Sequence, residues 1–375
     1  MPARVAWLDS ARALMLVLGV PFHASEMYRL SGGWRVASPD VSFAATLFGA
    51  LVHAFRMPAF FVLAGLFAAT LVERRGDGPW LCERARRLGV PLVATTLGFG
   101  WLESAIARAH REGLGLGEAV VATFDSSPTD WTHHRWFLFV LLLHCLTAVA
   151  LRRWGPANGA TRALGALWPG AGMPVALVAA LVAWPFAVAG LDALAGGAGL
   201  DGGPDAANFY LRYAPFFALG YAAARADGSL ERLLRLGRGE GALAALAIGL
   251  YVATYAGFRP GGAAGDAGSG AALARTGVDA LAGFYAARLA LAGARRWLDA
   301  PSPAVDLLVR SALAVYLVHE LFVLWLGAAL ARVALPPTLE IALVSVGSLA
   351  LSLGAFALSR RSATLSLALS GTRTP

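Results

Sequence analysis

The 375-residue sequence contains no lysine, only two cysteines and few charged residues of any kind. Charged residues make up 14% of the chain, against roughly 25% in soluble domains, and the mean hydropathy is +0.62. So apolar a chain predicts a single membrane domain over residues 1–375, where the length alone would allow two or three soluble domains. Cys82 and Cys145 are too few and too poorly matched in setting for a disulfide framework or a zinc site.

The positive charges are all arginine, 31 in number, and they give a formal net charge of +8. A basic chain can indicate a nucleic-acid partner, but these arginines lie between apolar runs and not on one polar face. We therefore expect no nucleic acid to bind. The sequence has no Gly-x-Ser-x-Gly motif, phosphate-binding glycine loop or cluster of metal ligands, and we expect neither a bound metal nor a permanently bound cofactor.

Ten apolar stretches are long enough to cross a bilayer, which takes about 20 residues each. They predict an all-α integral membrane bundle of about ten transmembrane helices, at roughly 11–28, 43–72, 88–107, 135–151, 172–191, 207–224, 241–257, 273–293, 311–331 and 338–358. The second is long enough to tilt, or to break near Pro58. Gly- and Pro-rich stretches at 155–174, 196–204 and 259–270, and the polar interval 108–134, predict loops.

The arginines between these stretches predict the orientation. With the N-terminus in the cytoplasm, most of them fall on the inner side, as the positive-inside rule requires. The outer connections hold only Arg29, Arg35, Arg108, Arg111, Arg259 and Arg332. We therefore predict that both termini are cytoplasmic.

Ionisable groups inside a bilayer are costly, so each one is a functional hypothesis. In the first apolar stretch, Arg12 and His23 are eleven residues apart, which places them on one helix face about 16 Å apart along the axis. His23 is the candidate base and Arg12 a candidate anion ligand. Alternatively, His23 bonds a neighbouring helix and Arg12 extends to the headgroups. Glu26 follows His23 on the same side, either to orient the imidazole or as an ordinary interfacial carboxylate.

Further candidates lie along the chain. Arg56 is deep in the second stretch, where it needs a carboxylate, water or an anionic ligand. Arg84 and Arg87, three residues apart, form a fork suited to phosphate, although the positive-inside rule alone also explains them. His134 and Trp136 begin the fourth stretch, where an interfacial aromatic belt is the alternative for the tryptophan. His319 and Glu320 form a pair inside the ninth, and Arg212 and Asp279 have no assigned role.

Together these residues resemble a known family. The chain is similar to the glucans biosynthesis protein C family, within the integral-membrane type-three acyltransferases. The motifs that carry the resemblance are, in chain order, Leu8-Asp9-Ser10-x-Arg12-Ala13, Pro21-Phe22-His23-x-Ser25, His53-Ala54-Phe55-Arg56-Met57, Phe60-Phe61-Val62-x-x-Gly65, Arg84-x-x-Arg87-x-Gly89-x-Pro91, His134-x-Trp136-Phe137-Leu138, Pro215-Phe216-Phe217-x-Leu219-Gly220 and Tyr316-Leu317-Val318-His319. Arg135 departs from the pattern, where an apolar residue is common, and Glu320 where a neutral or basic one is expected.

The resemblance implies an inner-membrane enzyme that moves an acyl group, usually succinyl and alternatively acetyl, from cytoplasmic acyl-CoA to a hydroxyl of periplasmic glucan. The glucan-synthesis machinery is then a possible partner. The family's Arg-and-His motif corresponds to Arg12 and His23, and its basic fork to Arg84 and Arg87. The competing function is a transporter or flippase for an anionic lipid or sugar, against which the absence of inverted hydropathy repeats argues.

The expected mechanism combines the residues with the resemblance. The phosphates of acyl-CoA bind Arg84, Arg87 and Arg12, and His23 takes the proton of the sugar hydroxyl as it attacks the thioester. A covalent acyl-histidine is the main alternative. Arg56 or a backbone amide stabilises the oxyanion. We expect His134, Trp136 and His319 to contact the acceptor.

Overall fold

The computed structural model describes residues 6–32, 34–125, 128–153, 179–184, 186–188, 190, 205–225, 228–237, 239–257, 269–300, 302–333 and 335–373. These residues form helices and connections and no β-strand, which confirms the all-α prediction. They divide into two compact units, each built from three separate stretches of chain. Unit 1 comprises residues 1–11, 53–81 and 143–300, and unit 2 comprises residues 12–52, 82–142 and 301–375.

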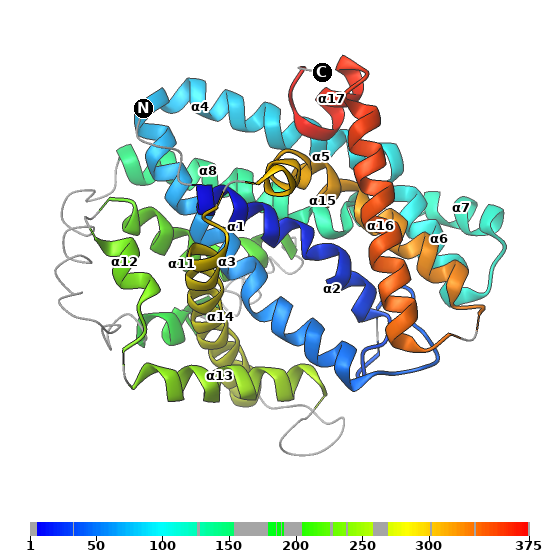
Figure 1. The fold of residues 1–375 in the computed structure, drawn as a ribbon, viewed down its shortest axis with the longest axis horizontal. Helices are drawn as coiled ribbons and strands as arrows, with labels where there is room; N and C mark the ends of the chain where they lie inside the picture. Colours follow the sequence, from blue (N-terminus) through cyan, green and yellow to red (C-terminus); the bar gives the residue numbers. More distant parts are fainter. Residues whose placement is uncertain are drawn as a thin grey trace. The chain divides into compact units, whose positions relative to one another are not determined.

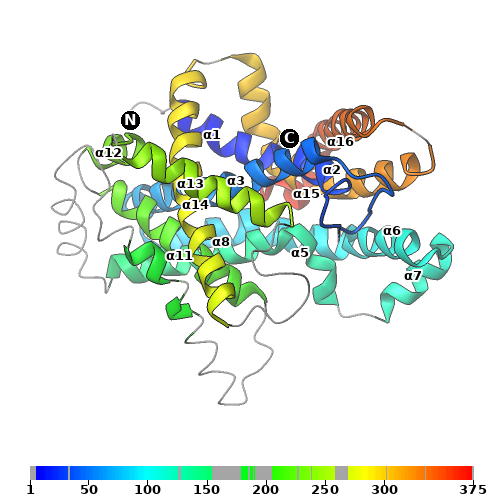
Figure 2. The same cartoon turned by 90° about the horizontal axis from the view of Figure 1, so that it is seen from below.

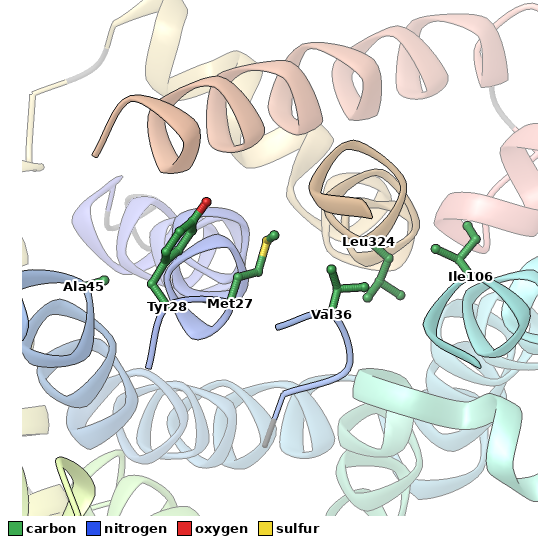
Figure 3. Packing of buried hydrophobic residues seen from close by; sticks show 6 residues of the cluster. All are labelled: Met27, Tyr28, Val36, Ala45, Ile106 and Leu324. Atoms are coloured by element: carbon green, nitrogen blue, oxygen red, sulfur yellow. The ribbon is translucent and has the colours of Figure 1, made fainter. Parts of the chain in front are cut away.

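Unit 2 is organised around the long helix α15, Pro303–Leu330, drawn in orange-brown in Figure 1. It packs against α16 (Pro337–Ser359), against α2 (Gly19–Glu26) and against α6 (Trp101–Glu112). Apolar side chains from α6, α15, the start of α3 (Phe43–Arg75) and the connection after α2 form a core cluster. Figure 3 shows six of them, with Val36 beside Leu324, which comes from α15.

The first predicted span is two helices in the structure, α1 (Ala6–Val17) and α2, separated at Leu18. Pro21 has no N–H to donate to the carbonyl of Val17, so the helical hydrogen bonding is interrupted there. The backbone still continues in the same direction, because Leu18 N donates to Leu14 O at 2.9 Å and Phe22 N to Leu18 O at 3.2 Å. The second predicted span is α3, Phe43–Arg75, which runs without a break through Pro58.

The third predicted span belongs to a helical run from Asp77 to Glu112. It contains α4 (Asp77–Arg84), α5 (Val90–Thr95) and α6, joined by two π-helical turns, Ala85–Gly89 and Thr96–Gly100. Such turns are frequent at functional sites. The second turn packs against η3, and a side chain at Gly100 would collide with the backbone carbonyl of Trp131.

The predicted loop at 108–134 is wrong. Helix α6 continues to Glu112, where Gly113 in a left-handed conformation (φ +68°) ends it, and α7 (Leu116–Phe124) then lies along α6 (Figures 1 and 2). The Glu118 carboxylate accepts the backbone N–H of Gly115 at 3.0 Å and caps the start of α7. The hydropathy pattern did not predict this mostly apolar nine-residue helix, because polar residues flank it on both sides. The 3₁₀ segment η3, Pro128–Arg135, follows.

Unit 1 contains α11 (Asp205–Ala223), α12 (Ser229–Leu234), α13 (Glu240–Tyr255), α14 (Ser269–Trp297) and most of α3. Helices α3 and α11 approach so closely that side chains at Gly65 and Gly220 would collide with opposing backbone. Small residues at such crossings are typical of membrane helix pairs. Helix α8, Trp136–Arg153, contributes residues to both units.

Five helical runs in the described part of the chain are long and apolar enough to cross a membrane: Phe43–Arg75, Asp77–Glu112, Asp130–Arg153, Pro303–Leu330 and Pro337–Ser359. The predicted span 172–191 lies partly outside the described residues, and the predicted loops at 155–174 and 196–204 lie entirely outside them. Of the predicted loop at 259–270 only residues 269 and 270 are described, and they begin α14. The prediction of ten spans and of two cytoplasmic termini therefore stays a prediction.

Candidate active site

Three of the seven histidines in the sequence meet inside unit 2. His23 comes from the last turn of α2, His134 from η3 and His319 from the middle of α15. The ring centroids of His23 and His319 are 5.3 Å apart, those of His134 and His319 4.9 Å, and those of His23 and His134 6.1 Å. All three residues are buried. The structure thus brings together three of the site residues that the sequence singled out.

Residues far apart in sequence hold this cluster in place. Trp34, in the connection between α2 and α3, stacks on the ring of His23 with centroids 5.9 Å apart and planes at 26°. The hydroxyl of Tyr316, on α15, donates a hydrogen bond to the backbone carbonyl of His134. These contacts hold the ring of His23 against the connection after α2 and the backbone of His134 against α15.

The backbone carbonyl of Tyr316 identifies the protonated nitrogens. It lies 2.7 Å from His319 Nδ1 and 2.7 Å from His134 Nε2. A carbonyl oxygen only accepts, so both of these nitrogens donate. In a neutral His319 the lone pair is then on Nε2, the form in which an imidazole accepts a proton.

Glu320, the departure at the end of the Tyr-Leu-Val-His motif, is the buried counter-ion of the cluster. Its Oε2 contacts His134 Nδ1, and its Oε1 lies 3.3 Å from Arg35 Nε. Arg35 stabilises the carboxylate form, so the contact with His134 Nδ1 is best explained by a proton on that nitrogen. The Tyr316 carbonyl and the Glu320 carboxylate therefore lie beside the two ring nitrogens of His134, an arrangement that favours positive charge on this ring, next to His23 and His319.

The other departure, Arg135, has a partner of its own. Its two terminal nitrogens contact the two carboxylate oxygens of Glu103, on α6, at 2.9 and 2.6 Å, and both side chains are completely buried. The guanidinium also lies over the ring of Phe99, 4.7 Å from its centroid. Two consecutive residues therefore connect η3 to its neighbours through buried polar contacts, His134 to Glu320 on α15 and Arg135 to Glu103 on α6.

His133, the residue before them, has φ +46°, a left-handed backbone conformation that is unfavourable for a residue other than glycine. Its Nε2 lies 3.0 Å from the carbonyl of Gly100 and 3.0 Å from the hydroxyl of Ser104. This strain accompanies the turn that directs His134 and Arg135 to different helices.

Glu26, Arg12 and Trp136, the other candidates from the first and fourth predicted spans, differ in burial and contacts. Glu26 is buried and forms an ion pair with Arg29 at 3.0 Å, and Arg12 is half-buried on α1. Trp136 is half-buried at the start of α8. The roles expected of Glu26, Arg12 and Trp136 stay predictions.

The basic fork has an acidic neighbour that the motif did not indicate. Glu83 Oε1 lies 3.6 Å from Arg84 NH2 and 3.5 Å from Arg87 Nε, so one carboxylate serves both guanidinium groups. Arg87 is in the π-helical turn Ala85–Gly89, which Gly371, after the C-terminal helix α17 (Ala363–Ser370), touches closely. The two arginines therefore share one carboxylate, and their role as a phosphate site stays a prediction.

Arg212 and Asp279, to which the sequence assigned no role, are partners at 3.4 Å in unit 1. They line a cavity of about 270 Å³ whose wall also contains His53 and Tyr251, whose Nδ1 and hydroxyl oxygen are 2.5 Å apart. Arg56, also in unit 1, is buried on α3.

Neither Glu103 nor the pairing of Arg35 with Glu320 was predicted from the sequence. Glu103 lies within the predicted span 88–107, and an ionisable residue in an apolar run was the available signal. Arg35 lies in a connection, where no pattern distinguishes it from other polar residues. Within the described part of the chain, no group of three or more His, Cys, Asp and Glu side chains is arranged to hold a metal ion.

Comparison with known proteins identifies the family. The model of an acyltransferase domain, that of the type-three acyltransferases, matches residues 5–357. The chain belongs to this acyltransferase family. With its long apolar helices it is a multi-pass membrane protein.

Curated relatives carry the name glucans biosynthesis protein C. The protein from Salmonella gallinarum is 31% identical over 161 residues, which are 42% of this chain and 41% of the relative. The protein from Escherichia coli strain SMS-3-5 is 34% identical over 143 residues, 37% of each chain. The match thus spans about two fifths of the length of these relatives. No solved structure matches the chain.

Proposed function

We propose that this acyltransferase moves an acyl group from cytoplasmic acyl-CoA to a hydroxyl of periplasmic glucan or another cell-envelope carbohydrate, with His23 as the base. The observation that carries the proposal is the meeting of His23, His134 and His319 beside the buried Glu320. The name of the curated relatives supports a glucan as acceptor.

The reaction needs one base and one way to stabilise negative charge. The sugar hydroxyl forms the new ester bond to the acyl carbon, the carbon–sulfur bond breaks, and the hydroxyl proton passes to His23 and then to the sulfur of coenzyme A. His134, whose two nitrogens face the Tyr316 carbonyl and the Glu320 carboxylate, is proposed to supply the positive charge that favours the negatively charged transition state. The alternative is an acyl-histidine intermediate, with the ester formed in a second step.

Arg84, Arg87 and Arg12 are the proposed ligands of the CoA phosphates. The shared contact with Glu83 supports this assignment for the fork, because it directs two guanidinium groups to one point before any ligand binds. The expected role of Arg56 in stabilising the oxyanion stays a prediction. Succinyl is the proposed acyl group, with acetyl as the alternative.

The experiment that tests the function is release of coenzyme A by the purified protein. Wild-type protein with succinyl-CoA or acetyl-CoA and a glucan oligosaccharide should release free CoA and give an oligosaccharide heavier by one acyl group, detected by mass spectrometry. Transport of an anionic lipid or sugar without thioester cleavage would favour the alternative function, a transporter or flippase.

The proposed direction of transfer requires both termini in the cytoplasm. Reporter fusions within 155–165 should be active on the cytoplasmic side and those within 196–204 on the periplasmic side, because the arginine-rich connections stay inside. The reverse pattern at both positions would overturn the orientation and the direction of acyl flow.

A further inference from the structure

A second feature of unit 2 is a basic cavity of about 340 Å³ between η3, α6, α7 and the connection after α2. Three arginines line it, Arg35, Arg108 and Arg111, against one aspartate, Asp130. Hydroxyl groups of Ser104 and Thr123 and the ring of His133 complete its polar wall. The cavity therefore has excess positive charge and several hydrogen-bond donors.

The three arginines are not equally committed to protein partners. Arg35 contacts Glu320 through Nε, and Arg108 contacts Glu112 through Nε at 3.3 Å and the carbonyl of Ala122 through NH1. Arg111 is exposed and makes no ion pair or hydrogen bond with any residue that the structure describes. Arg135 differs from Arg111, because it is completely buried and contacts both carboxylate oxygens of Glu103. Arg135 is a structural cation, whereas Arg111 is available to a ligand.

The predicted topology makes this gathering unexpected. Arg35, Arg108 and Arg111 are three of the few arginines assigned to the outer side, where the positive-inside rule gives no reason for them. Their location around one cavity calls for a different explanation. Guanidinium groups that converge on a cavity are the usual recognition element for carboxylate and phosphate.

The cavity adjoins the histidine cluster through one residue. Arg35 lines the cavity and contacts Glu320, which contacts His134 beside His23. We propose that this cavity binds an anionic group, carboxylate or phosphate, that one of the two substrates carries next to the reacting centre. The proposal rests on the proposed acyl transfer and makes it more specific, since it predicts that a charged substrate is preferred to its neutral counterpart.

The charge has two sources, the far end of a dicarboxylic acyl group or an anionic substituent of the acceptor, and a kinetic experiment distinguishes them. Purified full-length wild type, Arg111→Gln and the control Arg332→Gln are assayed with succinyl-CoA and acetyl-CoA, each with a neutral glucan oligosaccharide and with its phosphate ester. Arg332 is a matched control because it is an exposed arginine of unit 2 on the predicted outer side that does not line the cavity.

Loss of one charge-assisted contact should raise KM for the charged substrate about tenfold or more in Arg111→Gln. The neutral substrate and the Arg332→Gln control should remain near wild type. An effect confined to succinyl-CoA places the acyl carboxylate in the cavity, and one confined to the phosphate ester places the acceptor there. Equal effects on charged and neutral substrates, or none, overturn the proposal.

A binding measurement separates failure of this site from failure of the proposed function. Succinate and inorganic phosphate are titrated into wild type and Arg111→Gln by calorimetry, and binding of at least one should weaken about tenfold or more in the variant. If no thioester is cleaved but this binding persists, the acyl-transfer proposal fails and the anion site stands. If acyl transfer proceeds but neither anion binds, or both proteins bind equally, the anion site fails and the function stands.

Discussion

Each unit contains a completely buried histidine, but the two histidines have different surroundings. One is packed among aromatic rings, and the other has polar partners. In unit 1, His144 on α8 is stacked between Tyr210 and Phe217, with ring centroids at 4.5 and 4.7 Å, and Phe61 lies edge-on at 5.2 Å. Neither ring nitrogen of His144 has a hydrogen-bond partner among the described residues. In unit 2, His319 donates to the carbonyl of Tyr316 and lies beside two other histidines.

This difference distinguishes a histidine that serves only in packing from histidines that can take part in proton transfer. An aromatic stack without polar partners disfavours a charged imidazole and does not select which nitrogen carries the proton. The cluster in unit 2 selects the protonated nitrogens, because the Tyr316 carbonyl accepts hydrogen bonds from two rings. It also accommodates charge, because the Arg35–Glu320 ion pair lies beside those rings. A buried histidine indicates a site only when its surroundings contain such partners. Substitutions of His23 and His144 test that distinction, and substitutions of the charged residues in unit 2 test the contacts around the cluster and the basic fork.

The largest effect is expected for His23→Ala. Removing the base should reduce acyl transfer about 10²- to 10⁴-fold, the usual contribution of general base catalysis. The assay is release of CoA by purified protein, with insertion and thermal stability as the control for folding. Activity within about tenfold of wild type in a folded variant would exclude His23 as the base. Quenching the wild-type reaction and searching for acyl-His23 by mass spectrometry distinguishes direct transfer from the covalent route.

The buried charges that hold η3 are tested by Arg135→Met. The substitution leaves the Glu103 carboxylate buried without its cation, which should lower the free energy of unfolding by about 3–5 kcal/mol. The double variant Glu103→Leu with Arg135→Met removes both charges and should recover most of the loss. Thermal or denaturant unfolding in detergent measures both. A single variant as stable as wild type would show that the pair does not stabilise the protein.

A smaller effect is expected where the charges are more exposed, at Arg84 and Arg87. Replacing either with alanine should cost about 1.5–3 kcal/mol of CoA binding. The apparent KM for acyl-CoA should rise by roughly ten- to a hundredfold, more than that for the glucan. Arg86→Ala is the matched control, an exposed arginine in the same π-helical turn that shares no described contact with Glu83. Wild-type affinity in both variants would leave the positive-inside rule as the whole explanation of the fork.

Sequence patterns predicted the helical class, and they singled out His23, His134 and His319 individually, because hydropathy and motif spacing are local properties. They did not show how His23, His134 and His319 meet, since that depends on the packing of α2, η3 and α15. The departures Arg135 and Glu320 were visible as unusual residues, but their partners Glu103 and Arg35 lie far away in sequence. Helix α7 was missed because this short helix of nine mostly apolar residues lies within a polar interval.

The smallest effect is expected for His144→Phe, the counterpart of His23→Ala. A phenyl ring preserves the stack on Tyr210 and Phe217 and removes two polar nitrogens from an apolar environment. Burying such atoms without partners costs about 1–3 kcal/mol, so the variant should be as stable as wild type or more stable. The control is His319→Phe, which removes a ring whose Nδ1 donates to Tyr316 and should impair both activity and stability. Thermal unfolding and kcat/KM are measured for both variants. A folded His144→Phe protein that loses activity as severely as His23→Ala would show that a stacked histidine without polar partners also takes part in the reaction, and the distinction between the two units would fail.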